Sequence, residues 1–507
     1  MLLVTKEIMS QWWGWWNKMG IQNKTIVQLH EELVNKTLSA TEIVEEVLML
    51  IKSYRKDNFL LGLDEAKMKS LAQEIDQQGV DRGNLLAGIP YFAKDNFSTQ
   101  GLATTGGSAI LKDYVPPFNA TVINLLNNHQ ALMSGKTNLD ELGMGGTGTS
   151  SAFGAVPNPL SKKHLVGGSS SGSAYGVAKG IVPFALGSDT GDSIRRPASF
   201  AGIVGYKPTY GAISRYGMLP YSPSLDHPGV LAKTIEDSAI VADALIEFDA
   251  ADFTSLTVEK KGFYQNLNNF DQQLTFGYLT NVHDFLPPNL KKKYDELYAL
   301  LKKDGVVVKP LKFSQALLEA LSPVYMMISF SEAVSSNANL AGINFGTRVE
   351  GDRWEEVMKN TRTANFGNVV KRRFLIGSLN LQKENQVIYL HKAKKVRRLI
   401  CEEINKIFQA CDLLIIPPSQ TVAPLIEEGQ EFDDNQNDKT EYIDDILTLG
   451  NFSGIPSITI PFVVDHHKMP IGINVNAAAR EDLKMFQGAK YLATMIQQLE
   501  SQVLDHE

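Results

Sequence analysis

Cysteine is scarce in this sequence. Only Cys401 and Cys411 occur among its 507 residues, and both stand in apolar surroundings. Two thiols are too few for a disulfide framework or a four-cysteine zinc site. We therefore expect two buried, reduced thiols, which favours a reducing compartment and hence the cytoplasm.

Long apolar runs and an excess of basic residues are missing as well. No uninterrupted run approaches the roughly 18 apolar residues of a membrane-spanning helix, so we expect no membrane partner. Lys and Arg number 49 against 56 Asp and Glu, which gives a net charge of −7. Proteins that bind nucleic acid unaided carry a basic surface. We therefore expect no DNA partner, and any RNA-related role needs a second protein that supplies positive charge.

Metal-binding and targeting motifs are also lacking. The sequence has neither an HExxH motif nor clustered cysteines and histidines, so it predicts no metal site and no organic cofactor in this chain. The first residues lack the features of a secretory signal but hold four of the five tryptophans. We interpret residues 1–24 as a variable Trp-rich extension, with a true start at Met19 as an equal reading. An interfacial anchor is the weaker alternative, because no basic face accompanies the rings.

Short apolar segments alternate with helical patterns along the chain. Ser39 and Glu42 form a capping box in front of the first expected helix. Further helices are predicted at 120–128 and 388–408, and strands at 89–93, 131–134, 182–187, 306–308 and 413–416. This alternation is typical of an α/β fold in which helices cover a largely buried sheet.

Two charged segments interrupt that pattern. Residues 427–441 are acidic and nearly free of apolar side chains, which predicts a surface loop. A basic run lies on the expected helix 388–408 and comprises Lys392, Lys394, Lys395, Arg397 and Arg398. We interpret this run as a solvated helix face, with contact to RNA or to a partner protein as the alternative.

Two short motifs resemble phosphate-binding loops but lack the neighbouring residues or strand that such loops require. Residues 134–137 read Ser-Gly-Lys-Thr, but Gln130 stands where a P-loop needs its first glycine. The G-x-G-x-x-G pattern at 143–148 follows a polar, helix-like stretch, 137–142, instead of a strand. The sequence therefore predicts no nucleotide site at either place.

A third short motif keeps an alternative open. Residues 168–172 match the G-x-S-x-G elbow of α/β-hydrolases, with Ser170 as its nucleophile. That elbow needs a preceding strand and a later His–Asp pair. Several histidines follow Ser170 in the chain, so spacing alone does not exclude this chemistry.

The segment 166–229 is dense in glycine and serine yet retains apolar periodicity, which a flexible linker lacks. Glycine permits close backbone approach, so such turns can present N–H groups to a developing negative charge. Three stretches carry a family resemblance: GIPYFAKDN at 88–96, GGSSSGS at 167–173 and GSDTGDSIRRPA at 187–198. They resemble the motifs of the amidase signature family. The resemblance implies one catalytic domain over 25–507, with a central mixed β-sheet covered by helices on both faces.

The resemblance also implies a Ser–cis-Ser–Lys triad. Ser193 matches the nucleophile, Ser169 the bridging serine after a cis peptide, and Lys94 the base. The backbone N–H groups of Thr190, Gly191 and Asp192, with that of Ser193, would hold the oxyanion.

A lysine base near neutral pH needs help from its surroundings. Its pKa must fall by about three units from roughly 10.4, a cost of about 4 kcal/mol that burial can impose. A neutral Lys94 could then take the Ser193 proton through Ser169.

Ser171 and Asp192 depart from the family pattern, because both stand where its motif has glycine. A carboxylate beside a forming oxyanion is repulsive. We therefore expect the Asp192 side chain to point away while its N–H still donates. A non-catalytic scaffold, silenced by Asp192, is the alternative.

Within the family, the chain is most similar to the glutaminase subunits of tRNA-dependent amidotransferases. The resemblance implies that Tyr325, Arg373 and Asp445 hold free glutamine. Arg373 offers a fork for the α-carboxylate, and Asp445 can accept from the α-ammonium group.

The same resemblance implies a heterotrimer with amidotransferase subunits B and C. The large partner would use ATP and Mg²⁺ to convert mischarged Glu-tRNA(Gln) or Asp-tRNA(Asn) with the released ammonia. A stand-alone amidase of the family, acting on small amides, is the alternative.

Overall fold

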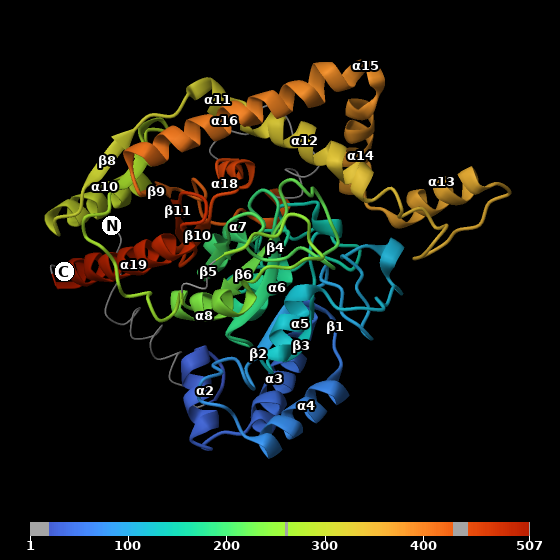
Figure 1. The fold of residues 1–507 in the computed structure, drawn as a ribbon, viewed down its shortest axis with the longest axis horizontal. Helices are drawn as coiled ribbons and strands as arrows, with labels where there is room; N and C mark the ends of the chain where they lie inside the picture. The colour runs from blue at the N-terminus through green and yellow to red at the C-terminus, as the bar shows by residue number, and fades with distance from the viewer. Residues whose placement is uncertain (1–19, 259–261, 429–444, 506–507) are drawn as a thin grey trace.

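The computed structural model describes residues 20–258, 262–428 and 445–505. Within these ranges the strands form one mixed eleven-stranded sheet in the order β1-β3-β2-β4-β6-β5-β10-β11-β9-β7-β8 (Figure 1). The strands are β1 (Leu60–Gly62), β2 (Pro90–Lys94), β3 (Leu132–Thr137), β4 (Phe184–Asp189), β5 (Val204–Lys207), β6 (His227–Ala232), β7 (Phe276–Leu279), β8 (Val308–Leu311), β9 (Leu413–Ile416), β10 (Ser457–Val464) and β11 (Pro470–Ala477).

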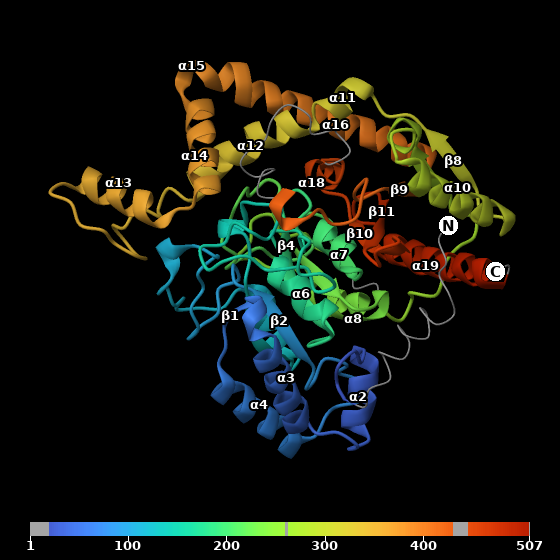
Figure 2. The ribbon, with the colours of Figure 1, turned by 180° about the vertical axis from the view of Figure 1, so that it is seen from behind.

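Helices surround this sheet (Figures 1 and 2). Those near the N-terminal strands are α2 (Ile26–Val34), α3 (Ala40–Tyr54), α4 (Glu65–Gln78), α5 (Thr121–Asn128), α6 (Ser171–Ala178), α7 (Arg195–Ala201) and α8 (Ile235–Leu245). The C-terminal half adds α9 (Thr280–His283), α10 (Pro288–Lys303), α11 (Gln315–Glu319), α12 (Leu321–Ser336), α13 (Trp354–Asn365), α14 (Asn368–Leu381), α15 (Lys383–Asn385), α16 (His391–Ala410), α18 (Thr448–Ser453) and α19 (Asp482–Asp505).

Alternation along β5 shows that helices cover both faces of the sheet. A Cβ at Gly205 would lie 2.6 Å from Ala198 of α7, so this residue faces α7. The next residue, Tyr206, packs its ring 4.6 Å from that of Phe486 on α19. Consecutive strand residues point to opposite faces. The two helices therefore lie on opposite sides, and the predicted α/β fold with a covered mixed sheet is confirmed.

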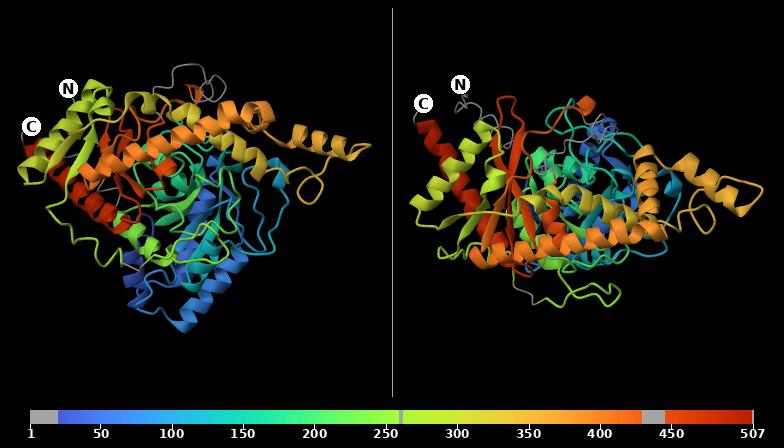
Figure 3. Two further views of the ribbon diagram at one scale, coloured as in Figure 1. Left: turned by 45° about the horizontal axis from the view of Figure 1, so that its top comes forward. Right: turned by 90° about the horizontal axis from the view of Figure 1, so that it is seen from above.

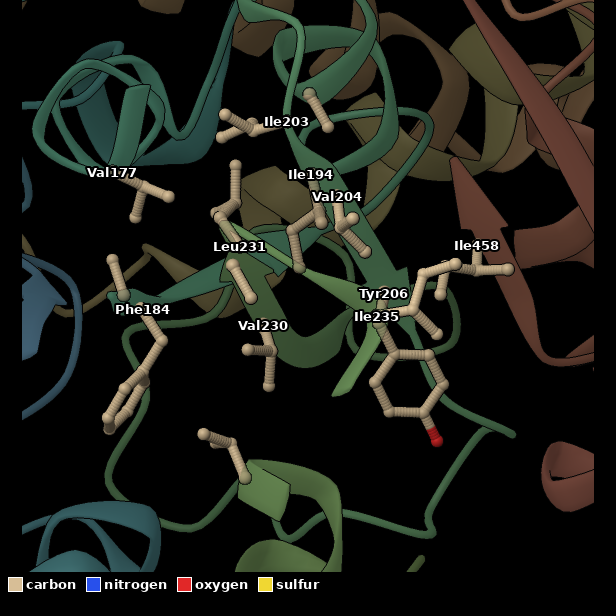
Figure 4. Close-up of a cluster of buried hydrophobic side chains, with 14 of the residues drawn as sticks. Val177, Phe184, Ile194, Ile203, Val204, Tyr206, Val230, Leu231, Ile235 and Ile458 are labelled. Carbon is tan, nitrogen blue, oxygen red and sulfur yellow. The ribbon is translucent and has the colours of Figure 1, made fainter. Parts of the chain in front are cut away.

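The main core extends along most of the sheet, from α2 and α3 to α10 and α19, and includes β4, β5, β6 and β10. Figure 4 shows its centre, where Ile194, Val204, Leu231 and Ile458 converge. Strand β9 joins this core to a second one: Leu413 and its alternate Ile415 belong to the main cluster. Leu414 and Ile416 instead pack with apolar residues of α12, α16 and α18. Figure 3 shows α12 and α16 running side by side, and both helices contribute side chains to this second core.

The predicted secondary structure agrees best where apolar runs are short and uninterrupted. The strand predicted at 413–416 is β9 without any shift. The Ser39–Glu42 capping box is present, with each side chain accepting from the other residue's backbone N–H. The strand predicted at 306–308 was misplaced, because pairing with β7 begins only at Val308. The helix predicted from 388 begins as a π-helical turn, Gln386–Leu390, ahead of α16.

The helix-like reading of 137–142 was wrong. Thr137 ends β3, and after two linking residues Asp140 precedes a single 3₁₀ turn, Glu141–Gly143. Leu142 within this turn has a φ of +53°, which a regular helix excludes. The polar residues of this stretch suggested the exposed face of a helix. They belong instead to a loop that follows the buried strand β3 and borders the site.

Two further expectations concern an apolar segment and the cysteines. By length and composition alone, residues 315–336 could cross a membrane, with a mean hydropathy of 1.2 over their most apolar window, but 44% of that window is buried inside the fold, as in a core helix. Two acidic residues, Glu319 and Glu332, interrupt this stretch, which is why no uninterrupted apolar run marks it. Cys411 is buried, but Cys401 is only half-buried, with its thiol 3.1 Å from the carbonyl oxygen of Phe452. The tryptophans of the extension and most of the acidic segment 427–441 lie outside the described residues.

Candidate active site

Lys94 ends β2 and is fully buried. Its Nζ lies within hydrogen-bond distance of three serine hydroxyls: Ser169 Oγ at 2.7 Å, Ser188 Oγ at 2.9 Å and Ser170 Oγ at 3.0 Å. Burial lowers the pKa of Lys94 to about 7, although Asp140, Asp189 and Asp226 oppose the shift. A large fraction of this amine is therefore neutral at physiological pH and able to accept a proton.

Ser169 is placed between Lys94 and the loop 140–143. The Gly168–Ser169 peptide is cis, as the family resemblance implies. Asp140 N donates to Ser169 O at 3.3 Å. A Cβ at Gly168 would lie 1.9 Å from the Asp140 carboxylate, so the motif glycine is required for this close packing.

Ser193 stands on the turn that joins β4 to α7. Ser170 N donates to Ser193 O at 3.2 Å, which ties this turn to the serine-rich loop. In the part of the chain that the structure describes, the Ser193 hydroxyl makes no hydrogen bond, so it is available to a substrate. The structure therefore joins Lys94 and Ser169 by a hydrogen bond and brings Ser193 beside them through its backbone.

The backbone N–H groups of residues 190–193 differ from those that follow. Ile194 N donates to the Asp189 carboxylate at 3.0 Å, and Arg195 N lies 3.4 Å from the same oxygen. Among the described residues, the four preceding N–H groups find no acceptor. Donors without a protein partner beside a nucleophile can stabilise a developing oxyanion.

Asp189 and Arg195 form a fully buried ion pair of 2.9 Å beneath this turn. Arg195 and its partners lower the pKa of Asp189 against the cost of its burial. Asn451 of α18 donates to the same carboxylate at 2.9 Å. This network holds the turn in place, and none of its bonds uses the backbone N–H groups of residues 190–193.

The Asp192 side chain pairs with Arg196 one helical turn further on. Arg196 N also donates to Asp192 O at 2.9 Å. Burial raises the pKa of Asp192, and the pairing with Arg196 opposes that rise. The carboxylate is thus directed along α7, as expected, while its own N–H remains without an acceptor in the described chain.

Tyr325 and Arg373 approach the site from α12 and α14. A Cβ at Gly191 would lie 3.1 Å from the Tyr325 ring, so that ring packs directly on the nucleophile's turn. Arg373 is buried, donates to Tyr221 Oη at 2.8 Å and stacks 5.1 Å from the Phe330 ring. Burial raises the pKa of Tyr325 well above its usual value.

Asp445 is placed by different contacts, in the turn before α18, where its carbonyl oxygen accepts from Thr448 N at 2.9 Å. Asn451 of that helix reaches Asp189, so α18 borders the site. Tyr221 contacts both Tyr325 and Arg373 and so links them. Asp445 lies apart from this pair, in the turn before α18.

Several residues outside the predicted set also shape the site. Ser188 Oγ lies between Lys94 Nζ and Asn96 Nδ2, each 2.9 Å away. Asp140 accepts from Gly148 N at 3.1 Å and Ser150 N at 3.0 Å, which holds a glycine-rich loop beside the cis peptide. Ser188 falls inside the quoted motif and could have been considered. Tyr221 carried no such signal.

The hydrolase elbow finds little support in this geometry. The residues before Ser170 form a loop rather than a strand. Ser170 Oγ bonds to Lys94 and to the carbonyl of Ser188, and no histidine contacts it among the described residues. The P-loop-like stretch is likewise buried in β3, where Lys136 pairs with Asp95 at 2.8 Å.

The fold and the buried lysine among serines define an amidase, and the chain belongs to the amidase family, whose model matches residues 42–485. The A subunit of glutamyl-tRNA(Gln) amidotransferase from Mycoplasma pneumoniae is 41% identical over 482 residues, covering 93% of this chain and 98% of that protein. Its counterpart from Streptococcus pneumoniae is 36% identical, covering 93% and 96%. The crystal structure of the Thermotoga maritima counterpart matches with a TM-score of 0.73 at 30% identity, covering 93% and 94%.

Replacing Asp192 by glycine tests whether its carboxylate harms the site. We expect Asp192→Gly to keep or raise amide hydrolysis, because the side chain points to Arg196 and only its N–H serves the site. Initial rates of ammonia release at saturating and low substrate measure this. A loss above about tenfold, roughly 1.4 kcal/mol of barrier, would contradict the account.

Proposed function

We propose that this chain is the glutamine-hydrolysing subunit of a tRNA-dependent amidotransferase. The observation that carries the proposal is Lys94, whose buried amine has a pKa of about 7 and contacts Ser169 at 2.7 Å. The relatives named as amidotransferase subunits support the particular reaction.

In this proposal Ser193 Oγ attacks the side-chain carbonyl carbon of glutamine. Its proton passes through the Ser169 hydroxyl to neutral Lys94. The tetrahedral oxyanion accepts from the N–H groups of residues 190–193. Collapse expels the amide nitrogen, which leaves as ammonia after taking the proton from Lys94. Water then attacks the glutamyl ester with the same base, releasing glutamate and restoring Ser193.

Tyr325, Arg373 and Asp445 would select free glutamine. The Arg373 guanidinium would pair with the α-carboxylate, and the Asp445 carboxylate with the α-ammonium group. Tyr325 packs on Gly191, so it would fix the substrate's position over the nucleophile. The chain would supply no metal or organic cofactor itself.

The experiment is ammonia release from glutamine by the purified chain, alone and reconstituted with subunits B and C, ATP, Mg²⁺ and mischarged tRNA. We expect hydrolysis that rises on reconstitution, together with conversion of Glu-tRNA(Gln) or Asp-tRNA(Asn). A stand-alone amidase would instead hydrolyse small neutral amides at a rate that the partners leave unchanged. That result would overturn the proposal.

The surface where α14 meets α16 supports assembly with partners. Leu375 and Leu379 on α14 and Val387 and Ile388 in the π-helical turn are 73%, 50%, 67% and 58% exposed. Lys392, Lys394 and Lys395 follow on α16, all exposed. Contiguous exposed apolar residues of this size are typical of protein interfaces. We therefore assign the three exposed lysines to partner contact. Arg397 of the same run donates instead to Ser224 and to the Phe452 carbonyl within the fold, and Arg398 pairs with Glu402.

Aspartate at this surface should weaken assembly. We expect Leu375→Asp combined with Ile388→Asp to lower the affinity for the partner subunits at least about tenfold, because buried interface residues carry most binding energy. Sedimentation velocity of the mixed subunits measures this. Phe253→Asp is the matched control, since Phe253 is fully exposed elsewhere. Equal loss with both variants, or none with either, would contradict the assignment.

A further inference from the structure

Glu141 is a buried carboxylate beside the site, with no role in the chemistry described above. It is 1% exposed and lies in the 3₁₀ turn Glu141–Gly143. Burial raises its pKa to about 7, although the bonds from Ser108 and Gly367 oppose that rise. Burying an ionisable group is costly unless it makes specific bonds. The hydrogen bonds of the Glu141 carboxylate therefore indicate the role of this residue.

One of these bonds crosses the molecule. Glu141 Oε2 accepts from Gly367 N at 2.8 Å, across 226 residues of sequence. Gly367 is the N-cap residue of α14, and its own carbonyl accepts from Lys371 N at 3.1 Å. Glu141 Oε1 accepts from the Ser108 hydroxyl, which steadies the carboxylate from the other side. A carboxylate at a helix N-terminus also complements the helix dipole.

Helix α14 carries Arg373 back to the same loop. Arg373 donates to Tyr221 Oη at 2.8 Å. A Cβ at Gly143, two residues after Glu141, would lie 3.9 Å both from Tyr221 Cβ and from Ser169 Oγ. The loop thus contacts α14 through Glu141, α14 contacts Tyr221 through Arg373, and Tyr221 lies against the loop again at Gly143, beside the bridging serine.

Apolar side chains also connect the loop, Tyr221 and the start of α14. Leu142 and Met144 of the loop pack with Tyr221 and with Phe366 and Val370 at the start of α14. Such contacts are not directional, so they do not by themselves determine which backbone N–H of α14 faces the loop. The Glu141–Gly367 bond is directional and holds the N-terminus of the helix against the loop.

We propose that Glu141 is a positioning residue that holds α14, and with it Arg373, at the distance from Ser169 that a glutamine substrate requires. The inference rests on the proposed function, because Arg373 is there the ligand of the α-carboxylate. The hydrogen bonds of the Glu141 carboxylate go to Ser108 and Gly367, and none goes to Lys94 or Ser169, so we expect its effect to reach the substrate through Arg373. Its loss should therefore impair glutamine binding and spare the chemical step.

Kinetics on two substrates test this. For Glu141→Ala we expect KM for glutamine to rise about tenfold with kcat changed less than about threefold, since misplaced binding groups cost this much. Hydrolysis of propionamide, which has no α-carboxylate, should stay unchanged. Glu141→Gln keeps an oxygen for Gly367 N and should restore most of the lost affinity. Equal losses on both substrates would overturn the proposal.

Asp76→Ala is the matched control. Asp76 accepts from Ala40 N at 2.7 Å and Thr41 N at 3.0 Å at the start of α3, far from the site. This variant removes the same kind of bond and should leave KM for glutamine unchanged. A rise equal to that of Glu141→Ala would show a general structural effect and overturn the proposal.

Hydrogen exchange gives a readout that does not depend on activity. We expect the amides of Gly367 and the first turn of α14 to exchange at least about tenfold faster in Glu141→Ala and in the milder Glu141→Asp, and unchanged in Asp76→Ala. Unchanged exchange in both Glu141 variants would overturn the proposal. If the wild-type chain releases no ammonia from glutamine, the proposed function fails, and the exchange measurement still decides whether Glu141 holds α14.

Discussion

Ser193→Ala should lower kcat for glutamine hydrolysis by at least about 10⁴-fold, roughly 5 kcal/mol of barrier, with KM nearly unchanged. Removal of the hydroxyl abolishes the acyl-enzyme route, whereas the groups assigned to glutamine binding stay in place. The variant should fold normally, because the Ser193 hydroxyl makes no hydrogen bond among the described residues. Single-turnover ammonia release measures the effect.

Two other serines of the same segment serve as comparisons. Ser170→Ala removes one neighbour of Lys94, so we expect a smaller loss than for Ser193→Ala. Ser173 Oγ bonds to the carbonyl of Leu186 at 2.9 Å and to Thr137 Oγ1 at 2.7 Å but not to Lys94, so folded Ser173→Ala should stay near wild-type activity. A larger loss for Ser170→Ala than for Ser193→Ala would favour the hydrolase elbow and contradict the assigned nucleophile.

Lys94→Met should lower kcat/KM by about 10³-fold, since a positioned general base contributes about 10²- to 10⁴-fold. Methionine has nearly the length of the lysine stem, so it fills the buried space without the amine. Circular dichroism and thermal unfolding confirm that the fold is kept. A loss below about tenfold in a folded variant would mean that Lys94 is not the base.

The same lysine sets the pH dependence. The neutral amine is the active form and its pKa is about 7, so kcat/KM should fall below pH 7 and level off above it. An unburied lysine would instead place this limb near pH 10. The residual activity of Lys94→Met should lack the limb. A wild-type limb near pH 10 would contradict the role of burial.

Sequence reasoning succeeded where a local pattern determines the structure. The strand 413–416 is apolar throughout and matches β9. Ser39 and Glu42 are three residues apart, and their reciprocal capping depends on nothing distant. Lys94, Ser169 and Ser193 could be proposed together because each stands in a long motif. Their meeting in space depends on β2 and β4 pairing in parallel beside each other.

The remaining features depend on contacts between distant segments. The Glu141–Gly367 bond spans 226 residues, and no pattern at either end marks it. Tyr221 is one of 16 tyrosines, and only the packing of α14 reveals that it orients Arg373. The start of β8 could not be located from the sequence, because residues 306–308 are all valine. Only the pairing with β7 shows that the strand begins at Val308. Tertiary structure, rather than local preference, determines these positions.

Trapping the covalent intermediate tests the central claim most directly. Wild-type chain mixed with isotopically labelled glutamine, quenched in acid within one turnover and digested, is analysed by mass spectrometry. The account predicts a labelled γ-glutamyl group on the peptide that contains Ser193, and none when Lys94 is replaced by methionine. Label on the Ser170 peptide instead, or undiminished label on Ser193 without the lysine, would contradict it.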